Sequence, residues 1–262
     1  MDKTRIDHYS EELYQALRGA QSVDPLTARE ADISIEDAYQ IQLGIIQRRM
    51  QRDGETIIGK KIGATSKAVQ SMLGVDQPDF GHLMSGMAYN DGDVVPIEGL
   101  LMQTRMEGEI AFILKRDLLG PGITNAAVLA ATECVMPCFE ICDSRIRDWK
   151  IKIQDTVADN ASAGLFLLGE RAVDPRKVDL KTCGMILEKN GEIVGLGAGA
   201  ATLGHPLNAV AWLANTLGRR GIPLKAGEVI LSGSLATMVS AKAGDHMRVT
   251  IGGMGSASVT FA

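Results

Sequence analysis

The segment TRMEGEIAFIL, residues 104–114, places two glutamates directly in front of an apolar run. Glu107 and Glu109 are separated by one glycine, and the run that follows predicts a buried β-strand. Alternate side chains of a strand point to the same face, so the two carboxylates should lie side by side. Two like charges this close repel each other unless a positive group lies between them. The pair therefore needs a positive partner.

A third glutamate has a similar setting in VMPCFEICDSR, residues 135–145. If this segment is extended, Glu140 shares a face with Cys138 and Cys142. Glutamate is seldom left charged in a protein core without a partner. Three such acids, flanked by strand residues and with no histidine nearby, suit a hard divalent cation with oxygen ligands, Mg²⁺ or Mn²⁺.

An alternative interpretation needs no metal. Glu107 and Glu109 could lie on an exposed edge strand, where water solvates both charges. They could also pair with a base such as Arg105 or Lys115. Spacing alone leaves these alternatives open.

Composition excludes several classes of protein. The chain has 262 residues, 45% of them hydrophobic and 23% charged, which are ordinary values for a globular protein. Its formal net charge of -5 gives a phosphate-binding surface no overall electrostatic support. No apolar run approaches the roughly 18 residues that suggest a membrane span. The N-terminus is polar and acidic, unlike a signal peptide, so a cytoplasmic protein is expected.

The four cysteines do not indicate a metal-thiolate site. Three of them are spaced at four in CVMPCFEIC, but Pro137 lies among them and the sequence has no CxxC pair. Small buried thiols in a reducing compartment are the better interpretation.

The texture of the sequence changes near residue 55. Residues 1–55 are expected to form a helical N-terminal segment, in which Ser34 and Asp37 make a capping box. Residues 56–262 contain short β-branched runs broken by Gly, Pro and Asp, and Asn190-Gly191 marks a hairpin turn. Helical patterns interrupt these runs only occasionally. An α+β fold with a mixed or antiparallel sheet is therefore predicted rather than a doubly wound one.

Two further stretches carry polar groups in unexpected places. In IIGKKIGATS, strand alternation sends Lys60 and Lys61 to opposite faces, so one can be solvated while the other points inward. An inward lysine can serve as a cation or a proton donor. In QDTVADNASAG, four polar residues predict a capped loop by their turn chemistry alone: Asp155, Asp159, Asn160 and Ser162.

Four long motifs then carry a family resemblance. They are GKKIGATSKAVQSMLGVDQPDFGHL, EGEIAFIL, FEICDSRIRDWKIKIQDTVADNASAG and LGHPLNAVAWLANTLG. Together they resemble the 2-keto-4-pentenoate hydratases of aromatic meta-cleavage pathways, within the fumarylacetoacetate hydrolase superfamily. The likeness runs from about Ile33 to the end of the chain. It implies a helical N-terminal segment packed on a fumarylacetoacetate-hydrolase-like mixed β-roll.

The resemblance also implies a set of site residues. The implied ligands of the Mg²⁺ or Mn²⁺ are Glu107, Glu109 and Glu140. The implied catalytic residues are Lys61, Asp79 and Ser162. Lys61 matches the active-site lysine of the family, whereas the resemblance implies a variable residue type at the position of Lys60. One departure is Thr104, where similar hydratases usually have proline. This residue lies at the entry of the strand and is not one of the implied ligands.

The implied activity is a hydro-lyase reaction in which water adds to 2-hydroxypenta-2,4-dienoate to give 4-hydroxy-2-oxopentanoate. Lys61 and Asp79 are the candidates for proton transfer, with the acid and base roles open. Ser162 would hold the substrate carboxylate or a metal-bound water. A homo-oligomer is expected, and a complex with 4-oxalocrotonate decarboxylase is also compatible with the resemblance.

Three rival functions fit the sequence less well. The 4-oxalocrotonate decarboxylases look similar but have an apolar residue where this chain has Asp79. Hydrolysis of a C–C bond would need a histidine base near the glutamates, and no histidine lies in a matching motif. A non-catalytic partner subunit should have lost one of the site residues, and all are present. The substrate tail stays open, because a single side chain could decide between hydrogen, methyl and carboxylate.

Overall fold

The computed structural model describes residues 1–262, except for the side chain of Met72. The α-helices are α1 (Lys3–Gly19), α2 (Leu26–Arg29), α3 (Ile35–Arg52), α4 (Lys67–Leu73), α5 (Asn125–Ala131), α6 (Ile153–Ala158) and α7 (Pro206–Gly218). Short 3₁₀ turns are η1 (Ser85–Met87), η2 (Arg147–Trp149), η3 (Asn160–Ser162), η4 (Pro175–Lys177) and η5 (Gly199–Ala201). None of the described helices is long and apolar enough to span a membrane.

The strands follow the helical N-terminal segment. They are β1 (Ile57–Gly63), β2 (Asp79–Met84), β3 (Ala88–Asn90), β4 (Val94–Val95), β5 (Arg105–Leu114), β6 (Thr132–Cys142), β7 (Ala163–Leu168), β8 (Gly184–Lys189), β9 (Glu192–Ala198), β10 (Val229–Leu231), β11 (Val239–Ser240), β12 (His246–Ile251) and β13 (Gly255–Phe261). The predicted hairpin is present, with Asn190 and Gly191 between β8 and β9.

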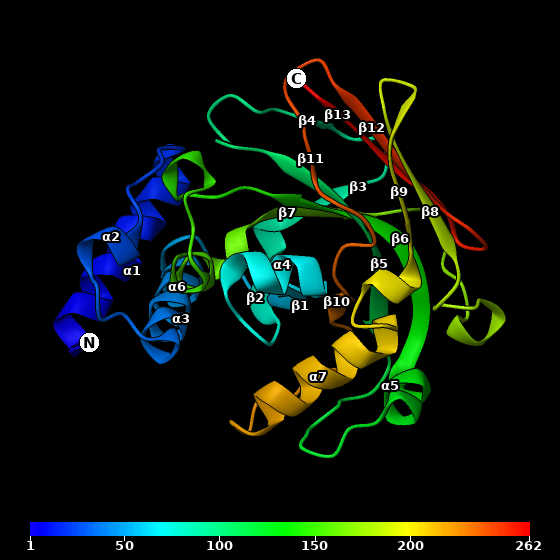
Figure 1. Ribbon diagram of the computed structural model, residues 1–262, viewed down its shortest axis with the longest axis horizontal. Coiled ribbons are helices and arrows are strands. Elements are labelled where there is room, and N and C mark those ends of the chain that lie inside the picture. The colour runs from blue at the N-terminus through cyan, green and yellow to red at the C-terminus, as the bar shows by residue number, and fades with distance from the viewer.

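These strands form two mixed sheets. The first has eight strands in the order β2-β1-β10-β5-β6-β7-β3, with β11 paired to β5. The second has five strands in the order β4-β13-β12-β8-β9. Parallel pairs (β1 with β10, β3 with β7, β4 with β13) interrupt otherwise antiparallel ladders. The sheets are strongly curved, and α7 packs beside α5 at the bottom of the view (Figure 1). The predicted α+β fold, with a helical N-terminal segment and a mixed β-roll, is confirmed.

The N-terminal helices form where local signals predict them. The Ser34 hydroxyl accepts a hydrogen bond from the backbone N–H of Asp37, whose carboxylate accepts one from the Ser34 N–H in return. This capping box satisfies two N–H groups that the first turn of α3 would otherwise leave unpaired. Helix α3 packs on α1 and α6, at the side of the sheet where β2 forms the edge (Figure 1).

One buried glutamine joins α3 to β2 and α6. Gln42 donates from Nε2 to the carbonyls of Phe80 on β2, at 3.0 Å, and Val157 on α6, at 2.8 Å. Its Oε1 lies 3.2 Å from Nδ1 of His82. Gln42 is fully buried, so these contacts supply the partners that its amide needs in the core. We call this contact set the Gln42 bracket.

The expectation that one of the adjacent lysines is solvated is wrong. Lys60 is only 3% exposed, and its Nζ lies 2.6 Å and 2.7 Å from the two carboxylate oxygens of Glu228. Strand alternation does send Lys60 and Lys61 to opposite faces of β1, but both faces are covered. The partner lies 168 positions away in sequence, so local pattern could not predict the pair.

Lys60→Met should destabilise the fold and leave the chemistry of the folded molecules nearly unchanged. The substitution leaves Glu228 buried without its cation, which costs about 3–5 kcal/mol in comparable buried pairs. Denaturant unfolding measures this loss. The double variant Lys60→Met/Glu228→Leu should recover most of it, because an apolar pair needs no desolvation of charge. A loss below about 1 kcal/mol in the single variant would contradict a stabilising role for the pair.

Candidate active site

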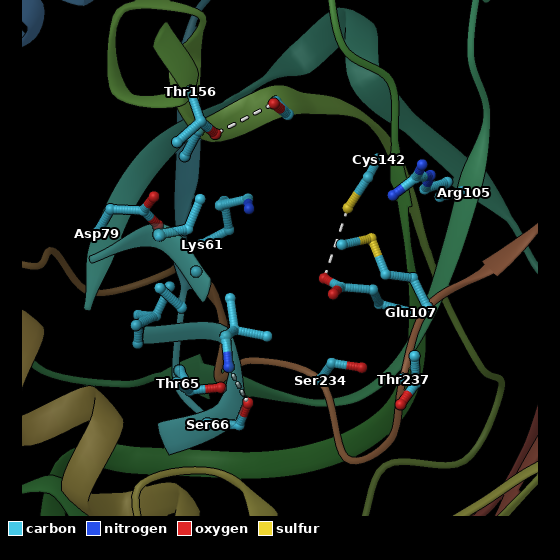
Figure 2. Close-up of a pocket in the computed structure, with 18 of the residues that line it drawn as sticks. Lys61, Thr65, Ser66, Asp79, Arg105, Glu107, Cys142, Thr156, Ser234 and Thr237 are labelled. Carbon is cyan, nitrogen blue, oxygen red and sulfur yellow. Dashed lines mark hydrogen bonds between the residues drawn. The ribbon is translucent and has the colours of Figure 1, made fainter. Parts of the chain in front are cut away.

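A pocket of about 560 Å³ is lined by residues of β1 and β2 and, across from them, of β5 and β6. One wall comes from β1, α4 and the start of β2, and the other from β5, the end of β6 and the loop around residues 234–238. Figure 2 shows Lys61 and Asp79 on one side of this pocket and Arg105, Glu107 and Cys142 on the other. The fold therefore brings a lysine from β1, acids from β2 and β5 and a cysteine from β6 into one cavity.

The register of β5 against β6 assembles the three glutamates. Glu107 lies opposite Glu140, and Glu109 lies opposite Cys138 in the next layer. Strand β5 is an interior strand, flanked by β10 and β6, so the exposed-edge alternative is wrong. Pairing of the glutamates with Arg105 or Lys115 is also not found among the described contacts.

Burial makes the charged form of these carboxylates unfavourable unless a cation or a hydrogen-bond donor compensates it. Glu109 is 0% exposed and Glu140 is 1% exposed, and burial raises the pKa of Glu109 well above its usual range and that of Glu140 to about 7. Oε2 of Glu109 accepts a hydrogen bond from the Gly233 N–H at 2.7 Å. Among the described residues, Oε1 of Glu109 and both oxygens of Glu140 have no hydrogen-bond donor. Unpartnered buried oxygens of this kind fit a hard divalent cation.

Cys142 and Glu109 are alternative candidates for the third metal ligand, beside Glu107 and Glu140. One ligand atom each from Glu107, Glu140 and Cys142 lie within 4.8 Å of one another. The Cys142 thiol, however, donates to Oε2 of Glu107 at 3.5 Å, and burial raises its pKa well above the usual value. A protonated soft sulfur is a poor ligand for Mg²⁺ or Mn²⁺. The unpartnered oxygen of Glu109 is the better third donor.

Lys61 is the cation closest to the glutamates. Its Nζ lies 2.9 Å from Oε1 of Glu140 as an ion pair, although this contact lacks hydrogen-bond geometry. Burial alone would lower the pKa of Lys61, but the surrounding carboxylates, Glu140 foremost, raise it well above its usual value. The lysine therefore enters the pocket as an ammonium group.

Asp79 faces Lys61 from the first position of β2. It pairs in register with Gly63, and a Cβ at that glycine would come within 2.1 Å of the Asp79 Oδ1. Gly63 thus leaves the space that the carboxylate occupies. Asp79 is 4% exposed and its Oδ1 has no described hydrogen-bond partner. Burial raises its pKa, and Lys61 opposes this shift.

Ser162 reaches the pocket from the strained turn η3. Asn160, Ala161 and Ser162 all have positive φ, between 52° and 53°, which is unfavourable for residues other than glycine. The Asn160 side chain holds the turn against β2 by bonding both the N–H and the carbonyl of His82. The Ser162 hydroxyl lies 3.1 Å from that of Thr156. The predicted loop is therefore found only from Asp159 to Ser162, because Asp155 lies within helix α6, and the turn contributes Ser162 to the pocket lining.

Two acids near Ser162, Asp155 and Asp159, make structural contacts outside the pocket. Asp159 forms a buried ion pair with Arg145, which also donates to the Ala163 carbonyl at 2.9 Å. Asp155 accepts from the N–H and the hydroxyl of Thr27, at 2.9 Å and 2.7 Å, and so joins α6 to the N-terminal segment. Neither acid lines the pocket.

Several pocket residues were missed by the sequence reasoning. Arg105 and Trp149 line the same wall as Glu107, and further hydroxyls come from Thr65, Ser66, Ser234 and Thr237. Arg105 could have been found, because strand alternation places it on the face of Glu107 and Glu109. Trp149 and the hydroxyls lie in turns and loops, where no periodic pattern gives direction.

Comparison with known proteins identifies the family to which the chain belongs. Residues 61–262 match the family described as fumarylacetoacetate (FAA) hydrolase, C-terminal. The chain is 66% identical over 222 residues to a 2-hydroxypent-2,4-dienoate hydratase of Pseudomonas putida, covering 85% of this chain and 100% of the relative. It is 57% identical over 261 residues to a 2-hydroxyhexa-2,4-dienoate hydratase of Comamonas testosteroni, covering 99% and 98% of the two chains.

A solved structure extends the similarity to three dimensions. The 4-oxalocrotonate decarboxylase from Pseudomonas putida G7, complexed with magnesium and adipate, superimposes with a TM-score of 0.96 at 37% identity. The alignment covers 100% of this chain and 99% of the decarboxylase. The resemblance inferred from the four motifs is thereby confirmed, and the chain belongs to the fumarylacetoacetate hydrolase family.

Proposed function

We propose that this chain is a metal-dependent hydro-lyase that adds water to 2-hydroxypenta-2,4-dienoate and forms 4-hydroxy-2-oxopentanoate. One observation carries the proposal: Lys61, Asp79 and Glu107 line a single pocket, and Glu107 pairs in register with the buried Glu140. The identity of 66% to a dienoate hydratase supports the same reaction.

The proposed metal is Mg²⁺ or Mn²⁺, held by Glu107, Glu109 and Glu140. When bound, the cation would act as a Lewis acid on the carboxylate and 2-oxygen of the substrate. The Oε1 of Glu109 and the Oε2 of Glu140, which have no hydrogen-bond or ion-pair partner among the described residues, support this ligand set. The magnesium in the related decarboxylase structure is compatible with it.

The chain's own groups would handle the protons. The enol must first lose its O–H proton while carbon 5 gains a proton, which gives the 2-oxo-3-enoate whose carbon 4 can accept water. Asp79, with one oxygen free of partners, would hold that water and take its proton as oxygen bonds to carbon 4. Lys61 carries N–H donors at the glutamate side, so it would deliver the proton that carbon 3 gains. Ser162 would hold the substrate in place.

Lys61→Ala should lower kcat by about 10²- to 10⁴-fold, the usual loss for a proton-transfer group. Metal binding should persist, because none of the three carboxylates is removed. Stopped or continuous absorbance assays give kcat, and calorimetry gives the metal affinity. Lys60→Met provides the contrast, since its turnover per folded molecule should stay within a few-fold of the parent. The reverse ranking would show that the wrong lysine has been assigned.

Decarboxylation is the second candidate, because the superimposed structure is that of a decarboxylase. An absorbance assay that offers the dienoate and 4-oxalocrotonate in parallel, with Mg²⁺ or Mn²⁺, tests both. A hydratase should convert the dienoate to the 4-hydroxy product much faster than it releases CO₂ from 4-oxalocrotonate. Preferential release of CO₂ would overturn the proposal.

We also propose that the protein is a cytoplasmic homo-oligomer. The free thiols of all four cysteines suit a reducing compartment. The outer strand β9 exposes Ile193, Val194 and Leu196, and an apolar edge of this kind is usually covered. A complex with a 4-oxalocrotonate decarboxylase stays part of this proposal. Light scattering of the protein, alone and mixed with a decarboxylase, tests both assemblies.

A further inference from the structure

Arg105 lines the pocket beside Glu107. It is the first residue of β5, two positions before Glu107 on the same face, and it lies opposite Cys142. Two residues of a strand span about 7 Å, so the side chain starts within reach of a ligand held at Glu107. Figure 2 shows Arg105 across the pocket from Lys61 and Asp79.

The guanidinium of Arg105 is held in place by an aromatic ring. Its central carbon lies 4.3 Å from the centre of the Trp149 ring. Trp149 in turn donates from Nε1 to the Gln103 carbonyl at 3.0 Å. Asp148 and Trp149 both have positive φ, at 58° and 54°, a conformation that persists only where the surroundings enforce it. The ring, and the cation stacked on it, are therefore preorganised.

This cation has no anionic partner within the part of the chain that the structure describes. Lys61, the other basic residue lining the pocket, already pairs with Glu140. A planar guanidinium can bind a carboxylate through two parallel N–H···O bonds, and stacking leaves that edge free. Arg105 is thus a carboxylate-binding group without its carboxylate.

We propose that Arg105, stacked on Trp149, binds the C1 carboxylate of the 2-oxo acid and so sets the direction in which the substrate enters. This inference rests on the proposed function. The opposite wall offers a carboxylate no free cation, because Lys61 there is paired with Glu140, Asp79 is acidic, and α4 contributes apolar side chains such as Val69. The tail would point there. The substrate class is therefore 2-oxo acids, or their enols, with uncharged tails.

Two six-carbon probes separate the two ends of the ligand. 2-Oxohexanoate and 2-oxoadipate share the C1 carboxylate and the 2-oxo group, and only the second has a carboxylate at carbon 6. On the magnesium-loaded protein, Arg105→Gln should weaken both probes by the same factor, about 10- to 100-fold, as calorimetry measures it. Arg105→Lys should fall between, because an ammonium keeps the charge without the planar fork. Magnesium affinity should not change.

Arg248→Gln is the matched control, because Arg248 is exposed on β12 of the other sheet and both affinities should stay at the parent value. A loss confined to 2-oxoadipate would place Arg105 at the tail and overturn the inference. Unchanged affinity for both probes would overturn it as well. Binding is measured without turnover, so equal loss of both probes would support Arg105 even if the protein failed to hydrate the dienoate.

Discussion

Glu109→Gln should abolish tight binding of Mg²⁺ and Mn²⁺ and lower dienoate hydration by about 10³-fold or more, since a bound cation supplies several kcal/mol of charge stabilisation. The amide has the shape of the carboxylate, so Gly233 N–H keeps an acceptor and the fold should persist. The metal-free parent buries a carboxylate with an unpartnered oxygen. Glutamine removes that charge, so the metal-free variant should unfold at no lower temperature than the metal-free parent.

Thermal unfolding with and without metal measures this result. Metal should raise the unfolding temperature of the parent by linkage and leave Glu109→Gln unmoved, and Glu107→Gln and Glu140→Gln should behave in the same way. Glu133→Gln is a control on the same sheet, because Glu133 is exposed on β6 and pairs only with Lys115. Cys142→Ala should retain metal binding. If Cys142→Ala lost the metal while Glu109→Gln kept it, sulfur would be the third ligand.

Asp79→Leu should abolish water addition while leaving metal affinity intact. Hydration needs a water aimed at carbon 4 and a group that accepts its proton, whereas leucine offers no acceptor and excludes water. The glutamates lie on other strands, so their ligand geometry is untouched. The buried carboxylate has an unpartnered oxygen, and its removal should not unfold the chain. The dienoate should still ketonise slowly, because that step does not require Asp79.

Following the loss of dienoate together with formation of the 4-hydroxy product separates these two steps. Asp76→Leu serves as the control, because Asp76 is an exposed carboxylate of the loop before β2 and does not line the active-site pocket. Full hydration by Asp79→Leu would remove Asp79 from the mechanism and leave Lys61 as the remaining proton-transfer candidate.

Strand alternation and motif resemblance predicted the core of this site because its geometry is local. Glu107 and Glu109 share a face by their spacing alone, and the apolar run behind them identifies the strand that carries them. The layer formed by Glu107 and Glu140 needs only the pairing of β5 with β6. Periodicity also separates Lys60 from Lys61, although it cannot show what covers each face.

The rest of the site depends on contacts between distant segments. The burial of Lys60 follows from Glu228, which lies just before β10, and β10 pairs in parallel with β1. The stacking of Arg105 on Trp149 follows from a turn in which two residues have positive φ, and neither is glycine. Composition and spacing give no signal for such a turn, because its conformation is imposed by the surrounding structure.

The Gln42 bracket has a functional consequence. The family model begins at residue 61, so α3 lies outside the part that this model describes, although relatives align with the chain over its whole length. Through the bracket, α3 nevertheless contacts β2, the strand that begins with the water-activating candidate Asp79. The proposed metal ligands lie on β5 and β6, which the bracket does not contact. Substitutions in α3 can therefore affect Asp79 and what happens to the bound substrate, while the strands that carry the proposed metal ligands stay in place. The chemistry of the site can change in this way without rebuilding its metal ligands.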